Sequence, residues 1–234
     1  MGTVPSDGAR ERIRELAEVY AAEGGDYLTQ ASWWDSEDWS RHVHPGWNLP
    51  NPITRNDVFR LVKEARTVEL AEGAFVAVML WGYGQTGYGP HRVDEMKSSR
   101  PEGLGQYMLD IGKAAAPDTA DAYRYMADNK MNRATKLGPS YASKVVYFVT
   151  QGEGSPILDS VVARWIHKHH DCKWVFNPNK WSTTQYEDYQ SYCHDLLNEI
   201  NSLVPEGHRT LGLVEYLMFI DQVASSLPKW AKTI

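Results

Sequence analysis

The sequence predicts an all-α protein, folded as a compact helical bundle with a cleft. Apolar residues recur at intervals of three and four along several segments, which is the period of a helix face. Alternation with a period of two, which indicates strands, is scarce, and no internal repeat or low-complexity tract is present. In 234 residues, a hydrophobic content of 42% is enough for a buried core. We therefore expect one domain over residues 1–234.

The first helix is expected at residues 9–23, and an irregular, tryptophan-rich segment follows at 29–55. Thr54 or Asn56 can cap the next helix, and Asp118 or Thr119 can cap a helix that restarts after Pro117. Helical periodicity then returns in four more segments. The predicted helices after the first are 53–68, 102–131 with its break, 140–150, 159–168, 183–203 and 210–227.

Composition excludes several classes of protein. No apolar run approaches the roughly 18 to 20 residues of a membrane span, and the N-terminus is charged where a signal peptide would be apolar, so we expect a cytoplasmic protein that does not bind membranes. Two cysteines, Cys172 and Cys193, are too few for a disulfide framework or a four-cysteine iron–sulfur cluster, so free thiols are expected. The net charge of −6 argues against a protein that coats nucleic acid through a basic surface.

The segment 136–166 carries the most informative pattern. Leu137, Gly138 and Pro139 form a tight turn that glycine permits, and the proline suits the first turn of a helix. The backbone N–H groups at such a helix start can bind a phosphate. A Gly/Pro loop, QGEGSPI, follows, and Asp159 then falls at the N-terminal edge of the next helix, where its carboxylate can cap that helix. A plain helix cap is the alternative to a functional role for Asp159.

This order of hairpin, helix, Gly/Pro loop and aspartate, at about 133–166, resembles the helix-hairpin-helix DNA glycosylase superfamily. ILDSVVAR is similar to its 8-oxoguanine-glycosylase branch in particular, and the separation of Gly138 from Asp159 (159 − 138 = 21) allows an ungapped superposition. The resemblance implies that Asp159 is the catalytic aspartate. It also implies a partner, double-stranded DNA with a modified base, bound by a monomer without a cofactor or metal.

The same register places Ser140 where family members that also cleave the strand keep a lysine nucleophile, so base excision without strand cleavage is expected. Lys144 follows one helical turn later on the same face, and Phe148 another turn along. The resemblance puts these positions in the wall of the base pocket. Lys144 is then either a buried donor to the extruded nucleotide or, with a shifted register, the nucleophile; an exposed lysine is the third alternative.

The last long helix matches the branch independently. GLVEYLMFIDQV superposes on the segment whose Gln and Phe contact the extruded base, with Phe219 retained and Glu215 in place of the glutamine. A carboxylate only accepts hydrogen bonds, so Glu215 suits the exocyclic amine of cytosine, although guanine-type bases also offer donors. Core packing is the alternative for Phe219, and an exposed helix glutamate for Glu215.

The resemblance therefore implies a monofunctional glycosylase that flips out and excises a modified base. The branch includes phage-defence enzymes that remove glucosylated 5-hydroxymethylcytosine, which is the substrate we expect first. A glycosylase for 8-oxoguanine and a non-catalytic DNA-binding module are the alternatives.

Further residues are candidates for DNA contact. The glycine-rich segment 82–89, with Tyr83, Gln85 and Tyr88, can fill the gap left by a flipped base, or it is an ordinary mobile loop. His91 and Arg92 can meet phosphate, or form a surface pair. Leu137, Gly138 and Ser140 are the expected contacts of the hairpin.

Two clusters have more ordinary interpretations. The tryptophans at 33, 34, 39 and 47 are expected to be core residues rather than a base-stacking platform. His167 and His170 could chelate a metal from a helix, but no HExxH or paired CxxC motif supports this, so no metal site is expected.

Overall fold

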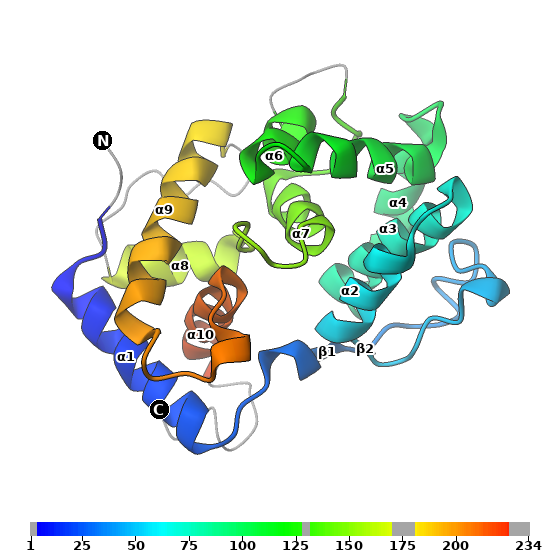
Figure 1. Ribbon diagram of the computed structural model, residues 1–234. Helices are drawn as coiled ribbons and strands as arrows, with labels where there is room; N and C mark the ends of the chain where they lie inside the picture. The colour runs from blue at the N-terminus through cyan, green and yellow to red at the C-terminus, as the bar shows by residue number, and fades with distance from the viewer. Residues whose placement is uncertain (1–3, 128–131, 170–180, 225–234) are drawn as a thin grey trace. The chain divides into compact units, whose positions relative to one another are not determined.

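A computed structural model describes residues 4–127, 132–169 and 181–224 (Figure 1). In these ranges almost all regular structure is helical; the strands found there are the two-residue segments β1 (Ala31–Ser32) and β2 (Ile53–Thr54), which pair antiparallel. The prediction of an all-α helical bundle is confirmed. None of the helices in the described ranges is long and apolar enough to cross a membrane.

The chain divides into two compact units. Unit 1 contains Met1–Gly25 and Gly152–Ile234, and unit 2 contains Asp26–Gln151. The chain returns to unit 1 at Gly152, shortly after the end of α7 (Pro139–Val149). The helix of the predicted hairpin therefore belongs to unit 2, and Asp159 belongs to unit 1. One domain over residues 1–234 stays a prediction.

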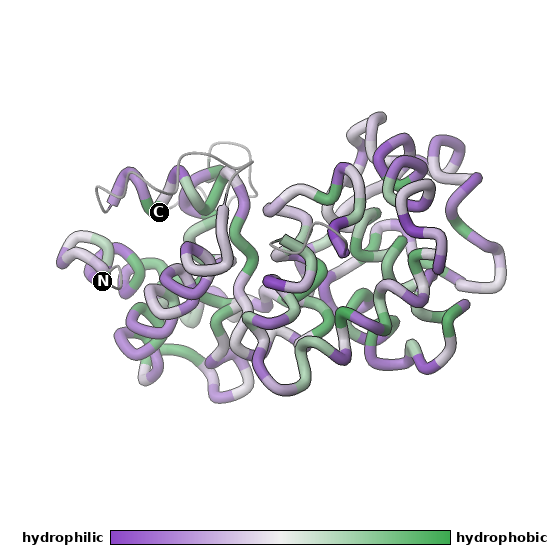
Figure 2. Tube along the Cα trace, turned by 90° about the horizontal axis from the view of Figure 1, so that it is seen from above, coloured by the Kyte–Doolittle hydropathy of each residue, from purple (hydrophilic) through white to green (hydrophobic). Residues whose placement is uncertain are grey.

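Unit 2 is arranged around α7, which packs against α2, α3, α5 and α6 (Figure 1). Helix α3 is apolar around most of its circumference and is therefore buried on all sides from Gly73 to Leu80. Figure 2 shows such hydrophobic stretches alternating with hydrophilic ones along the trace. The helices of unit 2 besides α7 are α2 (Arg55–Glu64), α3 (Val68–Tyr83), α4 (Gly89–Ser98), α5 (Gly103–Ala115) and α6 (Thr119–Ala127).

In unit 1, α10 contacts the three other helices (Figure 1). Arg12 of α1 and Trp165 of α8 both donate hydrogen bonds to Asp221 of α10, with distances of 2.6 Å and 2.7 Å for the shortest bond of each. This carboxylate therefore joins three helices. The helices of unit 1 are α1 (Asp7–Ala22), α8 (Ser160–His169), α9 (Thr183–Ile200) and α10 (Leu211–Val223).

The helix caps resolve the alternatives left by the sequence. Thr54 caps α2 in a reciprocal capping box with Asp57, and Asp118 caps α6 by accepting from the N–H of Ala120 at 2.9 Å. Asn56 lies inside α2, and Thr119 is the first residue of α6.

Two glycine assignments were wrong. The glycine-rich segment is not a long loop, because Gly82 lies inside α3 and Gly89 begins α4, which leaves residues 84–88 as the connection. In the hairpin turn, Lys136 is the residue with positive φ, at 65°, whereas Gly138 has an ordinary φ of −75°. Gly138 is therefore not required by the backbone conformation of the turn.

Candidate active site

Asp159 lies immediately before α8 and caps it. Its Oδ1 accepts hydrogen bonds from the backbone N–H groups of Val161 at 2.9 Å and Val162 at 3.1 Å. The carboxylate is half-buried, and it stands at the positive end of the helix dipole, which favours a negative charge. The predicted cap is confirmed, and it fixes one oxygen of the carboxylate in space.

The loop before Asp159 is held by side chains of α9. Tyr186 Oη donates to the carbonyl of Pro156 at 3.0 Å, and Tyr189 Oη donates to that of Ile157 at 2.8 Å. Gln190 donates to the carbonyl of Gly154 at 2.5 Å. We call Tyr186, Tyr189 and Gln190 the α9 clamp. The sequence predicts the helix at 183–203 that carries these residues, but not the carbonyls that they bind.

Glu215 is buried, with 1% of its surface exposed, so the alternative of an exposed helix glutamate is wrong. Burial raises the pKa of the Tyr189 hydroxyl and of the Cys193 thiol, and the nearby Glu215 carboxylate raises both further. Glu215 therefore lies close to the α9 clamp. Phe219, one turn along α10, is half-buried.

In unit 2, Ser140 and Lys144 lie on one face of α7. Lys144 Nζ is 3.4 Å from Ser140 Oγ, and Lys144 is buried, with 6% of the residue's surface exposed. The ammonium also lies 5.4 Å from the centre of the Tyr141 ring. The alternative of an exposed lysine is therefore wrong.

Phe148 continues the same helix but has no exposed surface. Its ring packs against Phe59, Trp81 and Tyr147, with centroid distances of 5.0 to 5.2 Å. Phe148 is therefore a core residue of unit 2, and we do not propose that it contacts the base.

The end of α3 is packed tightly on α7. Tyr83 stacks on Tyr141 with centroids 4.0 Å apart, and Tyr141 Oη donates to the Gly82 carbonyl at 3.2 Å. Burial raises the pKa of Tyr83 to about 12. A Cβ at Gly82 would lie 2.9 Å from the Tyr141 ring and 3.1 Å from Lys144 Cδ. Tyr83 is therefore buried and positions the loop, whereas Gln85 is exposed in it.

The other predicted DNA contacts differ in exposure. Leu137 is buried, and a Cβ at Gly138 would meet nothing within 4 Å. His91 is exposed and 3.6 Å from Glu95, and Arg92 lies over the Tyr88 ring. The hairpin backbone at Gly138 is thus open on the side where a Cβ would point.

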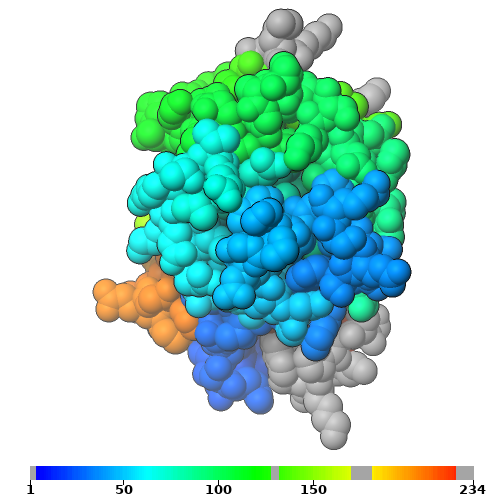
Figure 3. Space-filling model, turned by 90° about the vertical axis from the view of Figure 1, so that its right-hand side faces the viewer, coloured from blue at the N-terminus to red at the C-terminus, as the bar shows by residue number. Residues whose placement is uncertain are grey.

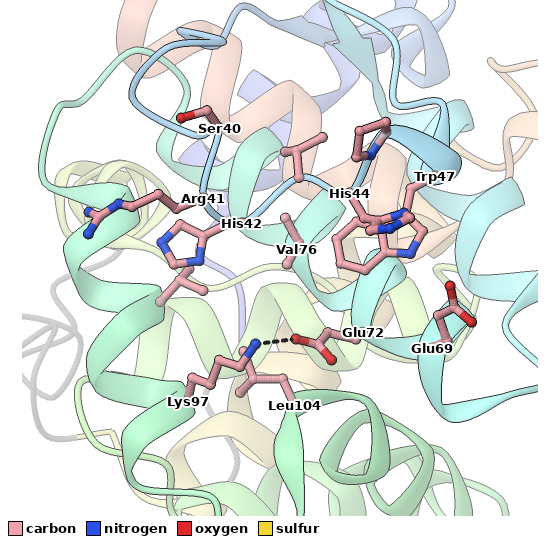
Figure 4. A pocket seen from close by; sticks show the side chains of 13 residues that line it. Ser40, Arg41, His42, His44, Trp47, Glu69, Glu72, Val76, Lys97 and Leu104 are labelled. Atoms are coloured by element: carbon pink, nitrogen blue, oxygen red, sulfur yellow. Dashed lines mark hydrogen bonds and ion pairs between the residues drawn. The ribbon is translucent and has the colours of Figure 1, made fainter.

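A cavity of about 450 Å³ lies in unit 2 beside the first half of α3, and its lining includes none of the predicted site residues (Figure 4). The Glu72–Lys97 ion pair of 2.8 Å lies across it, between the rings of His42 and Trp47. Glu72 is 11 residues before Tyr83, which is about 16 Å along a helix. The cavity is therefore separate from the face formed by Ser140 and Lys144.

Part of the predicted histidine cluster, His170 with Cys172, lies outside the described residues. His169 stacks on Trp165 at 4.5 Å and has a lowered pKa because it is partly buried. His167 is exposed.

The protein is thus an all-α protein in which the helix after the hairpin is followed by a loop bound by the α9 clamp and by an aspartate that caps the next helix. The family model described as "Putative 8-oxoguanine DNA glycosylase OGG-like protein" matches residues 25–219, and the chain belongs to this family. DNA is thus the partner that the family implies. No curated protein and no solved structure matches the chain.

Proposed function

We propose that this protein is a monofunctional DNA glycosylase, which extrudes a modified base from double-stranded DNA and hydrolyses its N-glycosidic bond to leave an abasic site. The observation that carries the proposal is the fixation of Asp159. One carboxylate oxygen accepts two N–H groups of α8, and the loop before it is bound by the α9 clamp. Membership of the OGG-like family supports DNA as the substrate.

Asp159 is the catalytic carboxylate in this proposal. As the bond between C1′ and the base nitrogen breaks, its electron pair leaves with the base and positive charge develops on C1′ and the ring oxygen. A carboxylate that is already oriented stabilises this charge without reorganisation. Water then attacks C1′, and its proton passes to the carboxylate and on to solvent, while the departed base, released as an anion, takes a proton from solvent. No strand cleavage follows from these steps.

Lys144 acts as a hydrogen-bond donor to the extruded nucleotide. Ser140 occupies the position at which strand-cleaving family members have a lysine nucleophile, and it has no amine. The burial of Lys144 and its contact with Ser140 Oγ support this role. Borohydride added during turnover should trap no covalent adduct. An adduct that disappears in Lys144→Ala would refute the monofunctional mechanism and make Lys144 the nucleophile.

The substrate that we propose first is glucosylated 5-hydroxymethylcytosine in phage DNA, which makes the protein an antiphage enzyme. The buried acceptor Glu215 supports a base that presents an exocyclic amine, and Phe219 one turn away can stack on that base. The second candidate is 8-oxoguanine, which is favoured by the description of the family and offers donors of its own.

The test uses three DNAs: unmodified, with 8-oxoguanine, and glucosylated phage DNA. Abasic sites are measured by alkaline cleavage after incubation with the full chain and with Asp159→Asn. Asparagine is as good a helix cap as aspartate, so this variant should fold. We expect base release from one modified DNA and its loss in Asp159→Asn with DNA affinity kept. Equal release by the variant would remove Asp159 from the mechanism, and no release from any DNA would favour a non-catalytic binding module.

A further inference from the structure

Trp33 differs from the other tryptophans of the segment 29–55. Trp39 is 1% exposed and Trp34 is 8% exposed, and the indole of Trp34 donates to the Pro50 carbonyl at 2.9 Å. Trp47 lines the cavity of unit 2. Trp33 is 60% exposed, so the expectation that it is a core residue is wrong.

The backbone around Trp33 is held on both sides. Ser32 pairs with Ile53 in the two-stranded sheet. Trp34 N–H donates to Asn51 Oδ1 at 3.3 Å, and Asn51 Nδ2 donates back to the Trp34 carbonyl at 2.8 Å. The indole of Trp33 is thus exposed to solvent on a backbone that is already held in place. Binding of a group over this ring would therefore cost the protein little backbone conformational entropy.

Trp33 borders the connection between α3 and α4. A Cβ at Gly84 would lie 2.8 Å from Ser32 Oγ and 3.4 Å from the Trp33 carbonyl oxygen. Tyr88, at the other end of this connection, is 55% exposed, and its ring is 5.5 Å from that of Tyr83. Figure 3 shows the segment around residues 30–50, in blue, on the surface of unit 2. The connection 84–88 therefore ends in one exposed aromatic residue, Tyr88, and is bordered at Gly84 by the segment that carries the other, Trp33.

The same contacts lead to α7. Gly84 follows Tyr83, whose ring stacks on Tyr141, and Tyr141 lies between Ser140 and Lys144 on the hairpin helix. All of these residues belong to unit 2. Tyr88 is thus joined to the hairpin helix through the rings of Tyr83 and Tyr141, and Trp33 borders the same connection through its backbone carbonyl at Gly84.

The charges at this surface favour a base over a phosphate. Asp38 Oδ2 lies 3.9 Å from where a Cβ of Gly87 would be, and Asp35 is also exposed. A carboxylate repels phosphate but accepts hydrogen bonds from the exocyclic amines of cytosine and adenine. Arg92 lies over the Tyr88 ring and places a cation at the edge of the surface.

We infer that Trp33 stacks on the nucleobase that loses its stacking neighbour when the adjacent nucleotide is extruded, with Tyr88 of the adjoining connection as the second exposed aromatic residue. The inference rests on the proposed function, because an intact duplex has no unstacked base to offer. Aromatic stacking of this kind is a common and sequence-tolerant way to hold single bases.

The first test measures affinity for a duplex that contains a tetrahydrofuran abasic analogue, by fluorescence anisotropy. Trp33→Ala and Trp33→Leu should both bind about tenfold more weakly than the native protein, which is about 1.4 kcal/mol, and Trp33→Phe should keep most of the affinity. Leu70→Ala is the matched control, since Leu70 is 46% exposed on the same unit and should have no effect. Unfolding temperatures of all variants should match that of the native protein because Trp33 contributes little buried surface.

A second test places 5-iodouracil at each position flanking the abasic analogue and maps ultraviolet crosslinks by mass spectrometry. We expect an adduct on Trp33 or Tyr88. Native affinity in Trp33→Ala, or crosslinks confined to other residues, would overturn the inference, including the case in which Trp33 serves a protein partner. Base release and its loss in Asp159→Asn are measured separately, so failure of the stacking role is distinguishable from failure of the proposed enzyme.

Discussion

The hydroxyl of Tyr189 donates a hydrogen bond to the carbonyl of Ile157, 2.8 Å away and two residues before Asp159. Both groups are buried in unit 1, so this bond fixes the end of the loop from which the carboxylate projects. The geometry of Asp159 thus depends on α9 as well as on the helix that it caps.

Tyr189→Phe should slow base release more than it weakens DNA binding. The loss of the hydroxyl leaves a buried carbonyl without its partner, which costs about 1–3 kcal/mol of stability. We expect the single-turnover rate to fall about tenfold, or about 1.4 kcal/mol in the activation barrier, because the carboxylate is less well oriented.

The control is Tyr20→Phe, which removes a buried hydroxyl of the same unit whose hydrogen bond, 2.8 Å long, is to His208 of another segment. It should lower stability comparably and leave the rate unchanged. Equal rate losses in both variants would reduce the α9 clamp to a purely structural role.

Arg55 should be the charged residue of unit 2 that is least tolerant of substitution. It is fully buried, donates to Gln30 Oε1 at 2.6 Å and to Tyr147 Oη at 3.1 Å, and lies 4.9 Å from the Trp81 ring. Arg55→Met should cost about 2 kcal/mol in urea unfolding, because these partners lose their donor. Arg55→Lys should recover only part of this, because lysine lacks the planar fork.

Arg60→Met on the same helix is the comparison, since Arg60 is about half exposed and its ion pairs are at the surface. Its effect should stay within about 0.5 kcal/mol. A similar cost at both positions would mean that burial of the Arg55 guanidinium contributes nothing.

Features that depend on neighbours in the sequence could be predicted from it. Thr54 and Asp118 cap their helices, and Asp159 caps α8, because a cap needs only a short polar side chain before an apolar period. Helices α1, α7, α8, α9 and α10 begin and end within a few residues of the predicted positions, and the fold class follows from such periodic segments. Helices α3 and α4 were not predicted, because α3 is apolar on nearly every face and therefore shows no helical period.

Features that depend on residues distant in the sequence could not be predicted from it. The periodicity does not distinguish Trp33, which is exposed, from Trp39, which is buried. It also does not say that Tyr83 turns inward to stack on Tyr141, 58 residues later (141 − 83), because that depends on how α3 packs on α7. The same reason hides the partner of Tyr189 in the loop.

The stability of unit 1 should fall in acid through Asp221. Burial alone would raise the pKa of this carboxyl, but hydrogen bonds from Arg12 and Trp165 outweigh burial and hold the pKa below its ordinary value of 3.8. A carboxyl with a lowered pKa in the folded state contributes stability above its unfolded pKa, and this contribution is lost as the pH falls through the folded value.

Asp221→Asn should therefore lower the free energy of unfolding by about 2 kcal/mol at pH 7, and the difference from the native protein should shrink as the pH falls below 3.8, the ordinary pKa of the carboxyl, and through its lowered folded-state pKa. Urea unfolding at a series of pH values measures this. Glu15→Gln removes the exposed partner of the same arginine and should change stability by less than about 0.5 kcal/mol. A constant difference between Asp221→Asn and the native protein at all pH values would contradict the assignment.

Gly138 allows DNA contact at the hairpin to be separated from folding. A Cβ at this position meets nothing within 4 Å, and φ is −75°, so the backbone accepts any residue. Gly138 is also the N-cap of α7, where serine is at least as favourable as glycine. Gly138→Ser should thus unfold at the native temperature. If a phosphate lies against the start of α7, the added side chain should nevertheless weaken duplex binding, by about tenfold in anisotropy titrations.

Gly82→Ala is the contrasting variant, because its Cβ would press on Tyr141 and Lys144 and should lower stability by about 1–3 kcal/mol. Native DNA affinity in Gly138→Ser would remove the hairpin turn from the DNA-binding surface.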